Sequence, residues 1–78
     1  MVIETSQEDR GVALLPSVAA VLTPAEREVA LELLRGRRPV EIARRRQVSI
    51  ETIRSQVKHI YAKVECKSVM EFAARARQ

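Results

Sequence analysis

Aromatic residues are almost absent from this chain of 78 residues, which contains only Tyr61 and Phe72. Proteins that bind RNA or single strands commonly stack several bases on exposed aromatic rings, so this scarcity argues against such a platform. Cysteine is as rare. Cys66 stands alone, which excludes a disulfide framework, a CxxC pair and a set of cysteine metal ligands, and which favours a reducing compartment.

Patterns typical of catalysis are missing as well. His59 is the single histidine, and no cysteine set or aspartate pair accompanies it in the sequence. The chain has two glycines and no glycine-rich phosphate loop. We therefore expect no enzyme, no cofactor, no metal and no small-molecule site. Cys66 is interpreted as a packing residue, with a redox role as the less favoured alternative.

The apolar stretch Val12–Leu22 is too short for a membrane span, and Pro16 interrupts it. Acidic residues precede it, whereas a signal peptide has basic residues at that place. We therefore predict a cytoplasmic protein without a membrane partner.

Charge is present but unevenly distributed. The formal net charge is +4. Residues 1–21 contain three acidic residues and one basic residue, whereas residues 22–78 contain thirteen basic residues and seven glutamates. Nine of those basic residues, but only two glutamates, fall between Arg35 and Lys63. Such a block favours a phosphate-rich partner, although a solvated arginine-rich helix surface would give the same count.

A chain this short forms at most one domain, and its small core is marginal by itself, so we expect it to pair with another chain. The first part, residues 1–21, is interpreted as an N-terminal extension. Residues 1–11 are polar and are expected to lack fixed structure, while residues 12–21 are expected to form a short apolar helix that packs on the body or on a partner.

Residues 22–78 contain four helix-start signals: Thr23, Pro39, Ser49 and Ser68. Thr23 and Ser68 are each followed three residues later by a glutamate, which predicts a capping box at both places. The expected helices cover about 24–35, 39–46, 50–64 and 69–77. The predicted fold is all-α, a four-helix helix-turn-helix domain without a wing.

The third of these helices has two different faces. Apolar residues recur at spacings of three and four and are expected to pack inward: Ile50, Ile53, Val57, Ile60 and Val64. The opposite half of the helical wheel is polar or small: Glu51, Arg54, Ser55, Lys58, His59 and Ala62. A short helix, a tight connector and a longer basic helix are typical of a helix-turn-helix motif, whose second helix enters the major groove of DNA.

Four blocks of sequence resemble the LuxR/GerE-type helix-turn-helix domain. LTPAEREV at 22–29 is similar to its LTPREREV opening, and EIA at 41–43 matches its EIA. VSxxTIRxxV at 48–57 is similar to its ISxxTVKxHV, and KV at 63–64 to its KL. The spacings match without gaps, and the likeness covers residues 22 to about 75.

The resemblance implies a stand-alone regulator without a sensor domain, bound to double-stranded DNA on the nucleoid as a homodimer. It implies that the base-reading positions are Arg54, Ser55 and Lys58. Phosphates are expected at Ser49, Thr52 and Lys63, and we add Arg46 and His59 as candidates. The dimer interface is expected on the last helix, on the stripe Val69, Phe72, Ala73 and Ala76. Glu28 matches an acidic position that bridges helices in the family.

Several positions depart from the family pattern. Arg37 and Arg46 stand where the family usually has leucine, and Glu32 replaces a common apolar residue. Glu65 replaces the usual glycine after KL, and Gln56 a common histidine. The two arginines are expected either to lay their stems over the core or to contact phosphates. Each replacement of leucine by arginine reduces the apolar surface buried in the core, so we expect the fold to depend more strongly on pairing with another chain.

Two other functions compete with this one. In the first, the chain is an interaction module that captures and inhibits a full-length LuxR-type regulator, and RNA polymerase is a further candidate partner. Region 4 of a sigma factor shares the opening motif, but residues 55–59 lack its arginine-rich SRxxRAR run.

Overall fold

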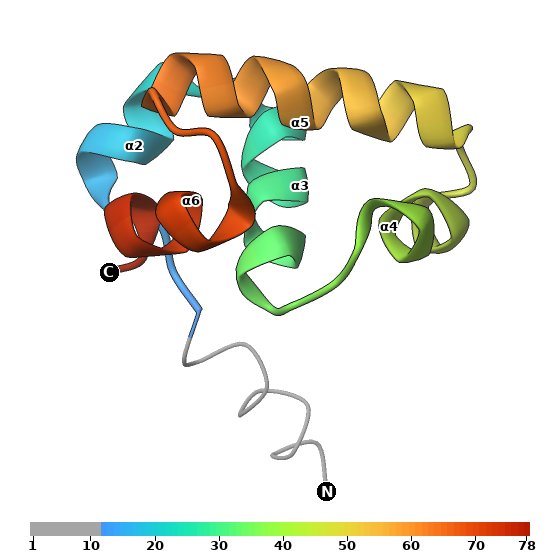
Figure 1. Cartoon of the computed structure of the whole chain (residues 1–78), viewed down its shortest axis with the longest axis horizontal. Helices are drawn as coiled ribbons and strands as arrows, with labels where there is room; N and C mark the ends of the chain where they lie inside the picture. Colours follow the sequence, from blue (N-terminus) through green and yellow to red (C-terminus); the bar gives the residue numbers. More distant parts are fainter. Residues whose placement is uncertain (1–11) are drawn as a thin grey trace, which may run out of the picture.

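The computed structural model describes residues 12–78, and the expectation for residues 1–11 lies outside this part. The described residues form five helices and no strand (Figure 1). They are α2 (Pro16–Val21), α3 (Pro24–Leu34), α4 (Pro39–Arg46), α5 (Ile50–Val64) and α6 (Val69–Ala76). The all-α helix-turn-helix prediction is confirmed, and the short apolar helix expected within residues 12–21 is α2.

Capping residues account for the start and end of α3. Thr23 Oγ1 accepts a hydrogen bond from the Glu26 amide, and Glu26 Oε1 accepts one from the Thr23 amide, as the capping box predicted. Leu22 is buried beside this start. The helix ends at Leu34 with Arg35 as its C-cap, and Gly36 follows with φ of 88°, a left-handed conformation that favours glycine.

The connection between α4 and α5 is a turn of three residues, 47–49. Gln47 ends α4 in the left-handed conformation, with φ of 58°. Ser49 Oγ accepts a hydrogen bond from the Thr52 amide at 3.2 Å and so begins α5, as predicted. The second capping box is only half right: Ser68 Oγ caps the Glu71 amide, but the Glu71 carboxylate accepts from the Lys67 amide, one residue earlier than expected.

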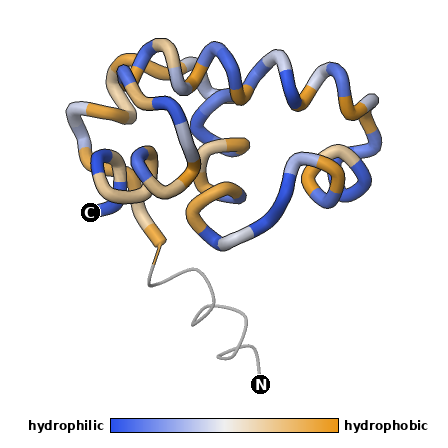
Figure 2. Tube along the Cα trace, viewed as in Figure 1, coloured by the Kyte–Doolittle hydropathy of each residue, from blue (hydrophilic) through white to orange (hydrophobic). Residues whose placement is uncertain are grey.

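The core lies where α5 crosses the other helices. In Figure 1, α5 runs along one side of the molecule, with α4 under its N-terminal part and α2 and α6 near its C-terminal part. The largest fully buried side chains come from all four domain helices: Phe72, Ile42, Ile53, Ile60 and Val29. Figure 2 shows the apolar residues turned toward this crossing and hydrophilic ones along the outer side of α5.

Residues 12–21 pack on the helical domain. The Leu15 amide donates to the Ala76 carbonyl at 2.8 Å, and the Gln78 amide donates to the Ala13 carbonyl at 2.9 Å. Val12, Leu14 and Val18 contact the core cluster. The two ends of the described chain are therefore held together. None of the helices in this part of the chain has the length and apolar character that a membrane crossing requires.

Candidate nucleic-acid interface

The inner face of α5 fixes the orientation of the helix. Ile53 and Ile60 are fully buried, and Ile50, Val57 and Val64 are partly buried against the core, as the apolar spacing predicted. Because this seam packs on α3 and α4, the opposite face must point to solvent.

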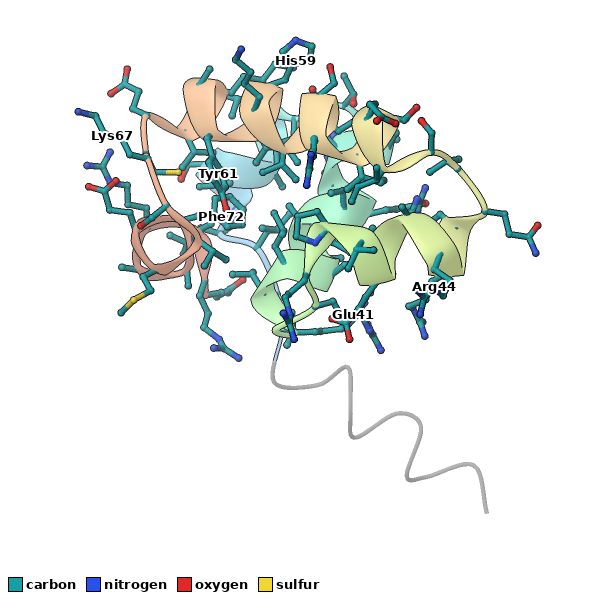
Figure 3. The ribbon with its side chains drawn as sticks, turned by 45° about the vertical axis from the view of Figure 1, so that its right-hand side comes forward. Glu41, Arg44, His59, Tyr61, Lys67 and Phe72 are labelled. Atoms are coloured by element: carbon teal, nitrogen blue, oxygen red, sulfur yellow. The ribbon has the colours of Figure 1, made fainter. Side chains whose placement is uncertain are left out.

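The outer face of α5 is exposed along its length. Arg54, Ser55, Lys58 and His59 are all exposed. None of them has an ion pair or a side-chain hydrogen bond within residues 12–78. Figure 3 shows His59 pointing away from the body, on the side of α5 opposite Tyr61 and Phe72. The predicted base-reading residues thus lie on one accessible cationic face.

Hydroxyl groups gather at the start of α5. Ser49 Oγ and Thr52 Oγ1 lie 2.9 Å apart, and both residues are exposed. The first amides of a helix carry partial positive charge and suit an anion, so this end is chemically compatible with a phosphate.

Two of the residues predicted to contact phosphate, Arg46 and Lys63, form ion pairs with glutamates of the protein itself. Arg46 Nη2 of α4 lies 2.8 Å from Glu28 Oε1 of α3, which gives Glu28 the bridging position expected from the family. Lys63 Nζ lies 2.8 Å from Glu26 Oε1. The Lys63 hydrogen bond, aided by the Thr23 amide, lowers the pKa of the Glu26 carboxyl below its ordinary value, against the opposing effect of burial.

A second ion-pair cluster surrounds Glu32, which is buried at the end of α3. Its carboxylate pairs with Arg37 and lies 3.8 Å from Arg35 Nη1 and 3.7 Å from Arg45 Nε. Two of the departures from the family pattern, Glu32 and Arg37, are therefore partners of each other. Sequence reasoning missed this because it considered each position separately.

Once these pairs are assigned, the accessible cations are fewer than the sequence suggests. On α4 and the turn before it, Arg38 and Arg44 are exposed and have no ion pair among the described residues. Figure 3 shows Arg44 projecting outward from α4. These two arginines were not singled out from the sequence, since only the three-dimensional pairing distinguishes them from Arg45 and Arg46.

The predicted dimer stripe on α6 is only partly available. Phe72 and Ala76 are fully buried in the core of the domain, where the Phe72 ring lies 5.9 Å from that of Tyr61. Ala73 is partly buried, and Val69 is 44% exposed. Met70, which the prediction omitted, is 80% exposed. The predicted set of interface residues is therefore corrected: Phe72 and Ala76 face the body of the domain, and Val69 and Met70 face outward.

Cys66 is buried between α5 and α6, and burial raises the pKa of its thiol. A raised pKa disfavours the reactive thiolate and agrees with a packing role. In residues 12–78 no group of three or more His, Cys, Asp or Glu side chains is placed to hold a metal ion.

A helix, a three-residue turn and a longer helix with an exposed cationic face define a helix-turn-helix DNA-binding protein. The family model of bacterial regulatory proteins of the luxR family matches residues 20–76, and the chain belongs to this family. It is accordingly a DNA-binding transcription regulator, of a family whose helix-turn-helix members are not enzymes. Searches of curated proteins and of solved structures find no significant match to the chain.

Proposed function

We propose that this regulator recognises specific double-stranded DNA by placing α5 in the major groove, with Arg54, Ser55 and Lys58 at the base edges. One observation carries the proposal: these side chains are exposed and have no ion pair or side-chain hydrogen bond within residues 12–78, while the opposite seam of the same helix is packed. They can therefore meet DNA without breaking any contact of the fold. Arginine and lysine donate to guanine, and the small serine permits close approach.

Phosphate contacts are proposed at both ends of this motif. Ser49 and Thr52 lie at the α5 N-terminus, where amides and hydroxyls suit an anion, and His59 lies farther along the outer face. Arg38 and Arg44 join them because they are exposed and have no ion pair in the described structure. Arg46 and Lys63 must first give up their glutamates, so their contribution is proposed to be smaller.

Pairing is proposed through the outward part of α6. Val69, Met70 and Ala73 offer an apolar surface that a second copy covers by two-fold symmetry. Two recognition helices then enter successive major grooves of a near-palindromic site, about 34–36 Å apart. We place the dimer on nucleoid DNA in the cytoplasm and assign it no enzymatic activity.

Selection from random duplex DNA tests this function, followed by titration of the selected site at several salt concentrations. We expect a symmetric site, and affinity that falls by about 0.9 log units per log unit of salt for each phosphate contacted. Absent or salt-independent binding would contradict the proposal. A scrambled duplex of the same composition is the control for specificity.

A second candidate function follows from Met70, whose 80% exposure is unusual for a large apolar side chain. In it, the α6 surface captures another LuxR-type regulator and blocks it, or contacts RNA polymerase. DNA binding without sequence preference, together with a stable complex with such a regulator, would favour this alternative. Arg54→Ala separates the two functions, because it removes a proposed base contact on the outer face of α5 and leaves unchanged the α6 surface that both pairing and capture use.

A further inference from the structure

One acidic residue lies on the face of α5 that is otherwise cationic. Glu51 is the only acidic residue of this helix. It is exposed, and its carboxylate makes no hydrogen bond or ion pair within residues 12–78. The DNA contacts proposed above leave this side chain without a role, although it stands in the first turn of α5, and the N-terminal part of a recognition helix is the part that contacts base edges.

The helical period places Glu51 within the face proposed to read bases. Successive helical residues are rotated by about 100° around the axis, so Glu51 lies between Arg54 and Ser55 around the helix and one turn earlier along it. Lys58 follows two turns later on nearly the same line. The hydroxyl pair at the start of α5 is rotated away from Glu51 by about 100° or more. A duplex that meets the three base-reading residues therefore also meets the Glu51 carboxylate.

A carboxylate at this place restricts which DNA can bind. Its charge has the same sign as that of the phosphates, and an ionised carboxylate can only accept hydrogen bonds. Among the base edges in the major groove, only the amino groups of cytosine and adenine donate. Adenine presents the N7 acceptor beside its amino group, whereas cytosine presents the donor alone, so cytosine is the better partner for a carboxylate.

We propose that Glu51 is a specificity-determining residue, whose carboxylate accepts a hydrogen bond from the N4 amino group of a cytosine and disfavours other bases at that position. A wrong base is rejected because it leaves the carboxylate facing DNA without a donor. Arg54, its neighbour on the same face, donates to guanine in the proposed function, so the two side chains read nearby bases by opposite chemistry. The inference rests on the proposed DNA recognition by α5.

Selection from random duplex DNA with the unmodified chain and with Glu51→Ala tests this role. The unmodified chain should select cytosine at one position of each half-site, and replacing that cytosine should weaken binding about 5- to 100-fold. For Glu51→Ala we expect the same replacements to change affinity by less than about 2-fold, while the other base preferences are kept. The affinity of this variant for a scrambled duplex should rise, because a negative charge near the phosphates is removed.

Two further variants separate this role from other effects of the charge. Glu51→Gln keeps the shape of the side chain but adds an amide donor, and an amide bonds N6 and N7 of adenine together, so adenine should replace cytosine in the selected site. Glu65→Gln is the matched control for net charge: Glu65 is exposed just after α5, and its replacement should leave every base preference unchanged. An acid in the first turn also interacts favourably with the helix dipole, a role that alters thermal unfolding and not base preference.

Unchanged base preferences in both Glu51 variants would overturn the inference, as would an equal loss of cytosine preference in Glu65→Gln. A preference of the unmodified chain for adenine at the position that depends on Glu51 would overturn the assignment to cytosine. In each of these cases the proposed function stands if the unmodified chain selects a site and Arg54→Ala weakens binding to it. If the unmodified chain selects no site, the proposed function and this inference fail together.

Discussion

Two basic regions of this molecule use their charge in opposite ways. On the outer face of α5, Arg54 and Lys58 are exposed and have no ion pair in the described structure. Between α3 and α4, Glu32 and Glu28 hold the guanidinium groups of Arg37, Arg45 and Arg46. In the sequence both sets belong to one basic block. The difference teaches that pairing, rather than the number of cations, decides which residues remain available to a phosphate.

The largest effect is expected from removing the carboxylate at the centre of the paired region. Glu32→Ala leaves the partly buried guanidinium of Arg37, whose side chain is 24% exposed, without its partner. Breaking a buried pair costs about 3–5 kcal/mol, and rehydration of these arginines reduces this to about 2–3 kcal/mol. Urea unfolding followed by circular dichroism measures the loss.

Glu51→Ala is the matched control, because Glu51 is an exposed glutamate without an ion pair in residues 12–78. It should change the free energy of unfolding by no more than about 0.5 kcal/mol. Equal losses for the two variants would mean that the Glu32 cluster adds nothing to stability.

The same substitution in each region compares free with paired arginine directly. Arg54→Ala should weaken binding to the selected DNA site by about 1–2 kcal/mol and leave stability nearly unchanged. Arg46→Ala should instead lower the free energy of unfolding by about 0.5–1 kcal/mol, as the ion pair with Glu28 is lost, and should affect DNA affinity less. Fluorescence anisotropy with a labelled duplex measures affinity. Comparable affinity losses would show that Arg46 also contacts phosphate.

Acid should weaken the contact between Glu26 and Lys63. Because the pKa of Glu26 is lowered in the folded protein, the unfolded chain binds its proton first as the pH falls. The stabilisation is fully present above the ordinary glutamate pKa, about 4.3, and is lost as the pH falls through the lower folded value. Glu26→Gln should therefore reduce the loss of stability between neutral pH and acid.

Urea unfolding at a series of pH values measures this effect. Glu65→Gln serves as control, since this glutamate is exposed and its carboxylate makes no hydrogen bond or ion pair in the described part of the chain. If Glu26→Gln and the unmodified chain lost stability identically as the pH falls, the charge of Glu26 would contribute nothing to the stability of the fold.

The helices were predictable because their signals are local. Thr23 and Ser49 mark helix starts within one turn of the residues they cap, and the apolar spacing of α5 follows from the helical period alone. The same period predicted which residues lie on the outer face of α5. The ion pairs were not predictable, because Glu26 and Lys63 are 37 residues apart and meet only where helices cross. The inward turn of Phe72 and Ala76 likewise depends on packing against the body.

The smallest net change is expected when both partners of the central pair are replaced together. Glu32→Leu with Arg37→Leu restores apolar residues that the family commonly has at both positions, so no charge is left buried without a partner. Replacing a buried ion pair by apolar side chains of similar volume is often neutral or stabilising. The free energy of unfolding of the double variant should therefore lie within about 1 kcal/mol of that of the original chain, although Glu32→Leu alone is clearly destabilised.

Glu32→Leu with Arg45→Leu is the control. It should not recover stability, because Arg45 is 55% exposed and lies 3.7 Å from the carboxylate, so Arg37 remains the unpaired buried charge. Equal recovery in the two double variants would mean that Glu32 holds the arginines as a diffuse group rather than through its contact with Arg37.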